Sequence, residues 1–183
     1  MGMRKIAMLA LLLGLLTGCG AAEAESALPE EMPVDFEIRY ENWVDEASPN
    51  IYDTGEKLLQ KDLVNTVEPH TAQTELAVWD ETKQEIYAKV RACALDRLTD
   101  EKLTSENLTA LGRGVQMTPL TEYEIMFTAD GETYTVTGDS TAGEYKDTNG
   151  RAARFYDFVQ YMNELFVSTP EYQSLPETLG GYD

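Results

Sequence analysis

The sequence contains little of the chemistry on which most catalytic and metal sites depend. Among 183 residues there is one histidine, His70, and there are two cysteines, Cys19 and Cys93. A zinc site needs three or four histidine, cysteine or carboxylate ligands at suitable spacing, and this chain does not supply the usual set. A serine or cysteine triad would have to use His70, and no Gly-x-Ser-x-Gly motif is present. We therefore predict no catalytic residue, no metal and no cofactor.

Positive charge is also scarce. Lysine and arginine total 14 against 33 aspartate and glutamate residues, which gives a formal net charge of −19. Such a chain is repelled by nucleic acid, so nucleic acid is excluded as a partner. The acidic surface either attracts a cationic partner or divalent ions, or serves only to keep the protein solvated. The densest group of oxygen ligands, from Asp139 to Asn149, lacks the spacing of an EF-hand loop and is typical of a polar connection.

A hydrophobic run long enough to cross a bilayer is missing as well. The apolar run of residues 6–16 falls short of the roughly 20 residues that a transmembrane helix needs. Arg4 and Lys5 precede it and small residues follow it, which is the pattern of an export signal. Removing residues 1–18 takes away both of these positive charges and changes the net charge from −19 to −21.

The end of this signal, Leu16, Thr17, Gly18 and Cys19, resembles the lipobox of bacterial lipoprotein signal peptides at every position. The resemblance implies that the Cys19 thiol receives a diacylglyceryl group and becomes the first residue of the mature protein. Two acyl chains hold a protein firmly on a membrane. The implied location is therefore the extracytoplasmic face of the cell membrane, and Cys93 is then left without an intramolecular disulfide partner.

Composition divides the chain into three parts. Residues 1–18 are the signal peptide, and residues 19–33 are the lipidated cysteine with a flexible tether of alanine, glutamate, serine and proline. Residues 34–183 are long enough for a single domain with a real core.

Hydrophobic periodicity predicts an α+β fold for that domain. Apolar and polar residues alternate, or extended runs recur, at 34–44, 51–54, 57–64 and 74–79, which predicts an antiparallel meander. A second alternating pair at 121–139 surrounds Asp130-Gly131 and predicts a hairpin with a type I′ turn. Helical spacing predicts helices at 80–95 and 151–167. The expected architecture is a two-layer sandwich of an antiparallel sheet packed by two helices.

Local signals refine these elements. Thr82 and Glu85 form a capping box for the first helix, with Asp80 as a competing cap. Cys93 falls on the apolar face of that helix, so we expect a buried and unreactive thiol. Residues 99–119 are expected to form a loop with at most one helical turn at 105–111, and the tail after Thr169-Pro170 is expected to lie on the surface.

A second resemblance covers nearly all of the mature chain. Asn50-Ile51-Tyr52-Asp53-Thr54, Lys61-Asp62-Leu63, the Asp130-Gly131 hairpin and the closing Pro170-Glu171-Tyr172 look like a group of uncharacterised lipoproteins from Gram-positive bacteria. This group has no assigned activity, so the resemblance implies fold and location only.

Two functions follow as hypotheses. The first is a non-enzymatic, membrane-tethered binding module of the cell envelope that uses its sheet edge or acidic face against an envelope protein or a cationic partner. The second is a hydrolase that acts on envelope polymers through carboxylates. Without a nucleophile–base pair, we favour binding. Several aromatic residues are candidates for lining a groove or for core packing: Trp43, Tyr52, Trp79, Tyr145, Tyr156 and Tyr161.

Overall fold

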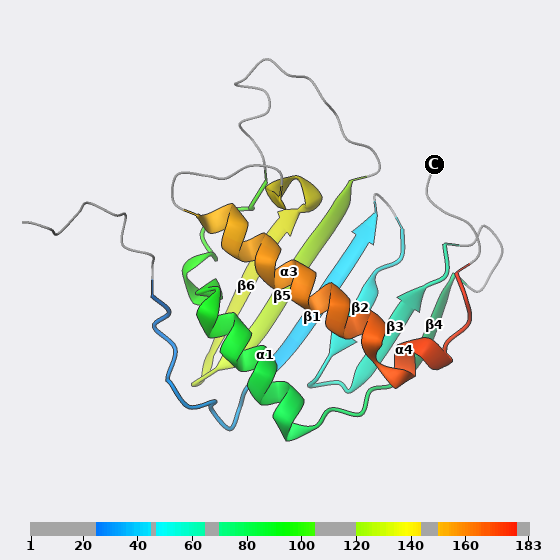
Figure 1. Ribbon diagram of the computed structural model, residues 1–183, viewed down its shortest axis with the longest axis horizontal. Coiled ribbons are helices and arrows are strands. Elements are labelled where there is room, and N and C mark those ends of the chain that lie inside the picture. Colours follow the sequence, from blue (N-terminus) through cyan, green and yellow to red (C-terminus); the bar gives the residue numbers. More distant parts are fainter. Residues whose placement is uncertain (1–24, 45–46, 65–69, 105–119, 144–149, 179–183) are drawn as a thin grey trace, which may run out of the picture.

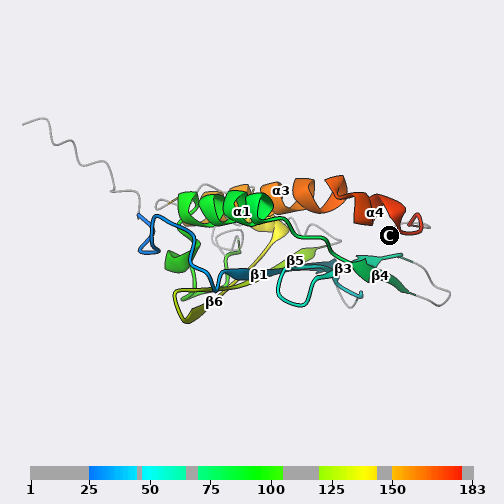
Figure 2. The same ribbon diagram turned by 90° about the horizontal axis from the view of Figure 1, so that it is seen from below.

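The protein is a two-layer α+β structure in which the described helices α1, α3 and α4 cover one face of a six-stranded antiparallel sheet (Figures 1 and 2). The computed structural model describes residues 25–44, 47–64, 70–104, 120–143 and 150–178. The strands are β1 (Glu37–Val44), β2 (Asn50–Asp53), β3 (Leu58–Asp62), β4 (Thr71–Glu75), β5 (Thr121–Ala129) and β6 (Glu132–Asp139). The helices are α1 (Asp80–Ala92), η1 (Leu95–Arg97), η2 (Ser140–Gly143), α3 (Arg151–Ser168) and α4 (Pro170–Ser174).

The strand order is β4-β3-β2-β1-β5-β6. The first four strands form the predicted meander, and the β5–β6 hairpin joins β1 on its other side. The fold prediction is therefore confirmed. One strand is displaced, because the sequence predicts a strand at 74–79 and the structure places β4 at Thr71–Glu75. That strand carries only small and polar side chains, so apolar alternation does not mark it, and Leu76 follows the strand as a buried residue.

The β5–β6 turn has the predicted type I′ chemistry. Asp130 and Gly131 both have positive φ, 55° and 78°, as this turn requires. The Asp35 carboxylate accepts hydrogen bonds from both amides, at 3.0 Å from Asp130 N and 2.7 Å from Gly131 N. The hydrogen bond from Gly131 is the largest cause that lowers the pKa of Asp35.

The core lies between the sheet and the two long helices. Alternate residues of the central strands, such as Ile38 and Ile125, face the helices and are fully buried. The helices contribute a continuous apolar stripe: Ile86 and Val90 from α1, and Phe155, Phe158, Val159 and Met162 from α3. At Gly138, a Cβ atom would clash with the Phe155 ring and lie 2.6 Å from the Leu103 carbonyl oxygen, so glycine permits this close approach.

The predicted caps of α1 are wrong. The N-cap is Trp79, which has extended φ and ψ and makes no side-chain cap hydrogen bond, and Asp80 is the first helical residue. The described chain beyond Thr169 lies on the surface as predicted, because no residue of the short helix α4 is buried, and the Thr169 side chain caps this helix by accepting a bond from Tyr172 N. The helical turn expected at 105–111 lies outside the described residues.

Residues 25–33, which the sequence analysis assigns to a flexible tether, pack against the helix layer. Leu28 is buried in the core. The Ala27 amide donates to Asp96 Oδ2 at 2.8 Å, and the Tyr87 hydroxyl donates to the Pro29 carbonyl at 2.7 Å. The packed chain therefore begins by residue 25, before the expected boundary at residue 34. Within the described ranges, no helix has the length and apolar character needed to cross a bilayer.

Candidate functional site

The face of the sheet opposite the helices is the candidate site. Figure 2 shows that α1, α3 and α4 lie on the other face, so no described helix covers this one. Because side chains alternate across a strand, the strand register assigns one set of residues to this uncovered face. One row across the four central strands contains Leu58, Asp53, Arg39 and Met126, and the next contains Gln60, Ile51, Glu41 and Glu124.

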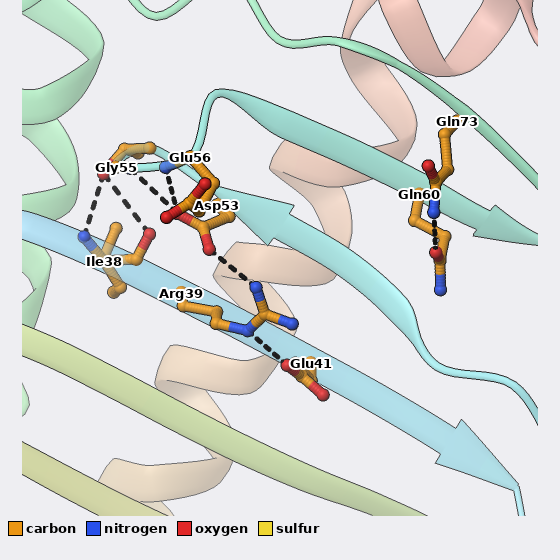
Figure 3. Close-up of polar contacts among 9 residues, drawn as sticks. Ile38, Arg39, Glu41, Asp53, Gly55, Glu56, Gln60 and Gln73 are labelled. Atoms are coloured by element: carbon orange, nitrogen blue, oxygen red, sulfur yellow. Dashed lines mark hydrogen bonds and ion pairs between the residues drawn. The ribbon is translucent and has the colours of Figure 1, made fainter.

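Arg39 is the centre of this face (Figure 3). Its Nη1 donates to Asp53 Oδ2 on β2 at 2.8 Å, and its Nε donates to Glu41 two residues along β1. Burial alone would lower the pKa of Arg39, but the hydrogen bonds and charges of Asp53 and Glu41 outweigh it and raise the pKa. The guanidinium therefore stays charged and is held between two strands.

Asp53 also holds the turn that follows β2. Its Oδ1 accepts hydrogen bonds from Gly55 N and Glu56 N, both at 2.9 Å. Beside it, the Thr54 hydroxyl accepts a bond from Ile38 N at 2.9 Å. Both carboxylate oxygens of Asp53 thus accept hydrogen bonds, one from Arg39 and the other from the turn, so this residue connects β1 to the turn after β2.

Carboxylates dominate the uncovered face. Among its described strand positions, eight are acidic and one, Arg39, is basic. The acidic positions are Glu37, Glu41, Asp53, Asp62, Glu75, Glu122, Glu124 and Asp139. Glu41 and Glu124 are direct cross-strand partners, an arrangement that is unfavourable for like charges. Stability alone does not account for this charge density.

A hollow of about 330 Å³ opens on this face beside Arg39. This volume is at the small end of the range of ligand sites, about 300–1,000 Å³. Its lining includes the carboxylates of Glu37, Asp53 and Glu56 together with Met126, which is 38% exposed. The hollow thus combines negative charge with one accessible apolar side chain.

A second hollow, of about 620 Å³, lies on the helix side of the molecule. The N-terminal segment contributes Glu25 and Glu30, and the helices α1 and α3 contribute Arg91 and Arg154. Arg91 Nη1 donates to the Glu30 carbonyl at 3.3 Å. Two acidic and two basic residues balance in this hollow, so its charge selects no ligand class.

The thiol of Cys93 is buried, as predicted, and is 2% exposed. Burial is the main cause that raises its pKa to about 12, so the reactive thiolate is scarce near neutral pH. Cys93 is therefore a core residue and not a nucleophile.

His70 is exposed immediately before β4, where its carbonyl accepts a bond from Leu63 N at 2.9 Å.

The acidic stretch considered for calcium is described only in part. Asp139 Oδ1 accepts a bond from Thr141 N at 2.9 Å, whereas residues 144–149 lie outside the described ranges. Among the residues with described positions, no group of three or more histidine, cysteine, aspartate or glutamate side chains is arranged to hold a metal ion.

The aromatic candidates do not form one surface. By register, Trp43 belongs to the uncovered face, whereas Tyr52 is buried on the helix side. Trp79 is 70% exposed at the start of α1, and Tyr161 belongs to α3. Tyr145 lies outside the described residues.

The structure does not describe the four lipobox residues, Leu16, Thr17, Gly18 and Cys19, so their assignment stays a prediction.

The sequence analysis did not predict the ion pair between Arg39 and Asp53. The signal that could have identified Asp53 is the Asp-Thr-Gly turn after β2, where an aspartate side chain commonly accepts hydrogen bonds from backbone amides.

Comparison with protein-family models finds no match to this chain, and comparison with curated proteins finds none either.

Proposed function

We propose that this protein is a membrane-anchored lipoprotein of the extracytoplasmic face, and that its folded domain is a non-enzymatic binding module for a cationic envelope partner. The lipobox at Leu16–Cys19 supports the anchor, which a diacylglyceryl group on Cys19 would provide. The uncovered, acidic face of the sheet is the observation that supports binding.

Charge complementarity selects the kind of partner. Glu37 and Glu124 are carboxylates that form no ion pair with another described residue, so a partner's cations can bind them, while Met126 offers an apolar contact between them. Surface carboxylates of this kind speed encounter with a basic partner and fix its orientation. Such attraction weakens with added salt, because the Debye length is about 8 Å at physiological ionic strength.

The experiment is capture of partners from solubilised native membranes by the intact lipidated protein and by residues 20–183. Two variants carry the same change in net charge: Glu37→Gln with Glu124→Gln on the uncovered face, and Glu85→Gln with Glu164→Gln on the exposed helix side. We expect only the first variant to lose the captured partner. Equal loss in both variants, or loss in neither, would refute docking on this face.

The same preparation separates binding from catalysis. A carboxylate-dependent hydrolase would turn over envelope sugars or peptides and would retain no stable partner. If the wild-type protein turned over such a substrate and Glu37→Gln did not, the binding proposal would be wrong and the protein would be a hydrolase.

A further inference from the structure

The two edges of the sheet differ. At the β6 edge, Leu103 lies beside the end of the strand: its amide donates to the Thr137 carbonyl at 2.8 Å, and Asp139 N donates to the Leu103 carbonyl at 3.1 Å. At the β4 edge, β3 pairs with the inner side of the strand, and no described residue pairs with its outer side. Among the described residues, one edge of the sheet is thus partly closed and the other is open.

The register identifies the free backbone groups of β4. Leu63 N donates to the His70 carbonyl at 2.9 Å, and Leu76 N donates to the Lys57 carbonyl at 2.8 Å. Hydrogen-bonded and non-hydrogen-bonded pairs alternate along an antiparallel ladder, so Ala72 and Thr74 also bond to β3.

The amides and carbonyls of Thr71, Gln73 and Glu75 therefore point away from the sheet. They form three successive donor–acceptor pairs, about 6.8 Å apart, which is the spacing that an added strand requires.

Natural edge strands are commonly protected by proline, lysine, a bulge or a covering segment. The β4 sequence, Thr-Ala-Gln-Thr-Glu, contains neither proline nor lysine, and its pairing with β3 is continuous over five residues. Gln73 and Glu75 are exposed, and Glu75 is the one charged side chain of the strand.

We propose that β4 accepts an extended, basic segment of the partner protein as a seventh strand of the sheet. This inference rests on the proposed function and adds the form in which the cationic partner binds. A lysine or arginine opposite Glu75 would form a favourable cross-strand pair. A second copy of this chain is disfavoured as the occupant, because each copy has a net charge of −19, or −21 without residues 1–18.

The test uses the full chain in detergent micelles and an acetylated, amidated heptapeptide of alternating lysine and valine. Amide hydrogen exchange, followed by NMR, reports each backbone group separately. In the free protein, we expect Ala72 and Thr74 to exchange slowly and Thr71, Gln73 and Glu75 to exchange fast. Saturating peptide is expected to slow the latter three amides at least tenfold.

A matched pair of variants tests the same contact. Gln73→Pro removes an outward amide and leaves the β3–β4 ladder intact, since proline is tolerated where an edge amide faces solvent. Gln73→Ala keeps the amide and removes the same side-chain bond to Gln60. We expect the peptide to bind Gln73→Pro at least tenfold more weakly than Gln73→Ala. The exchange pattern of the wild-type chain decides the question if Gln73→Pro does not fold.

The outcomes separate this inference from the function on which it rests. Peptide binding without slower exchange at Thr71, Gln73 and Glu75 would overturn the seventh strand and leave docking on the acidic face standing. Absence of peptide binding at millimolar concentration would also overturn it, while partner capture still decides the proposed function. If exchange at these three amides slowed with rising protein concentration in the absence of peptide, the strand bound at β4 would come from a second copy of this chain, and the proposed partner segment would be wrong.

Discussion

Replacing Asp53 with alanine tests whether one carboxylate connects β1, β2 and the turn after β2. The side chain of Asp53 is 7% exposed and accepts three hydrogen bonds: two from the amides of Gly55 and Glu56, and one from Arg39. Asp53→Ala removes all three acceptor contacts. Asp53→Asn retains the oxygen that accepts from the two amides, but it replaces the oxygen facing Arg39 with an NH2 group, which cannot accept the Arg39 bond.

The expected magnitudes follow from these contacts. A net hydrogen bond contributes about 1 kcal/mol, and a bond to a charged group about 1.5–3 kcal/mol. Because Arg39 is 30% exposed and keeps Glu41, its bond to Asp53 is placed at the lower end of that range. We therefore expect Asp53→Ala to lower the free energy of unfolding by about 3.5 kcal/mol and Asp53→Asn by about 1.5 kcal/mol.

Urea unfolding of the two variants and the wild type measures both values. Tryptophan fluorescence reports the transition, and circular dichroism confirms that all three proteins start from the same fold. An unchanged m-value would show that only stability has changed. Equal losses in the two variants, or a loss below about 1 kcal/mol for alanine, would refute the reasoning that Asp53 holds the turn.

Three further changes test the anchor, the packing and the hairpin. Cys19→Ser is expected to release the folded protein from the membrane fraction, and retention at the wild-type level would reject the lipid anchor. Gly138→Ala is expected to destabilise the domain by about 1–3 kcal/mol, since the new methyl group meets the Phe155 ring; an unchanged thermal midpoint would contradict this packing. The folded state lowers the pKa of Asp35 below 3.8, the pKa of this group in the unfolded chain. The Asp35 carboxylate therefore contributes fully to stability above pH 3.8, and this contribution is lost as pH falls through the lower pKa of the folded state. Asp35→Asn should therefore lose less stability than the wild type on acidification below pH 3.8, and parallel acid titrations would speak against the contacts of Asp35 with the turn.

Sequence patterns predicted the elements whose local chemistry is strong. The β5–β6 hairpin follows from the Asp130-Gly131 turn and from alternation on both sides of it, and α3 follows from its wide apolar stripe. The prediction missed the position of β4, because a polar edge strand buries too little apolar surface to show alternation. It also missed the packing of residues 25–33, since one buried leucine, Leu28, is a weak signal in a polar segment.

The candidate site could not be derived from local patterns, because it depends on register. Alternation in β1 assigns Arg39 and Glu41 to the polar face, but it does not say which residue of β2 lies opposite. The partner Asp53 is fixed by the pairing of Arg39 with Asp53 across the β1–β2 ladder. Shifting that pairing by one residue would place Tyr52 on the uncovered face, so burial of Tyr52 in the core determines the position of the carboxylate.

Glu25, the first described residue, and the β4 edge lie at opposite ends of the sheet (Figure 1). The segment that starts at Glu25 lies along α1, on the β6 side of the sheet, and β4 lies at the far side (Figure 1). Five inter-strand spacings of about 4.8 Å separate β6 from β4, which amounts to about 24 Å. With Cys19 acylated as proposed, the six residue steps to Glu25 span at most about 22 Å. The anchor would thus hold one end of the sheet near the bilayer and leave the β4 edge free for a partner that approaches from the other end.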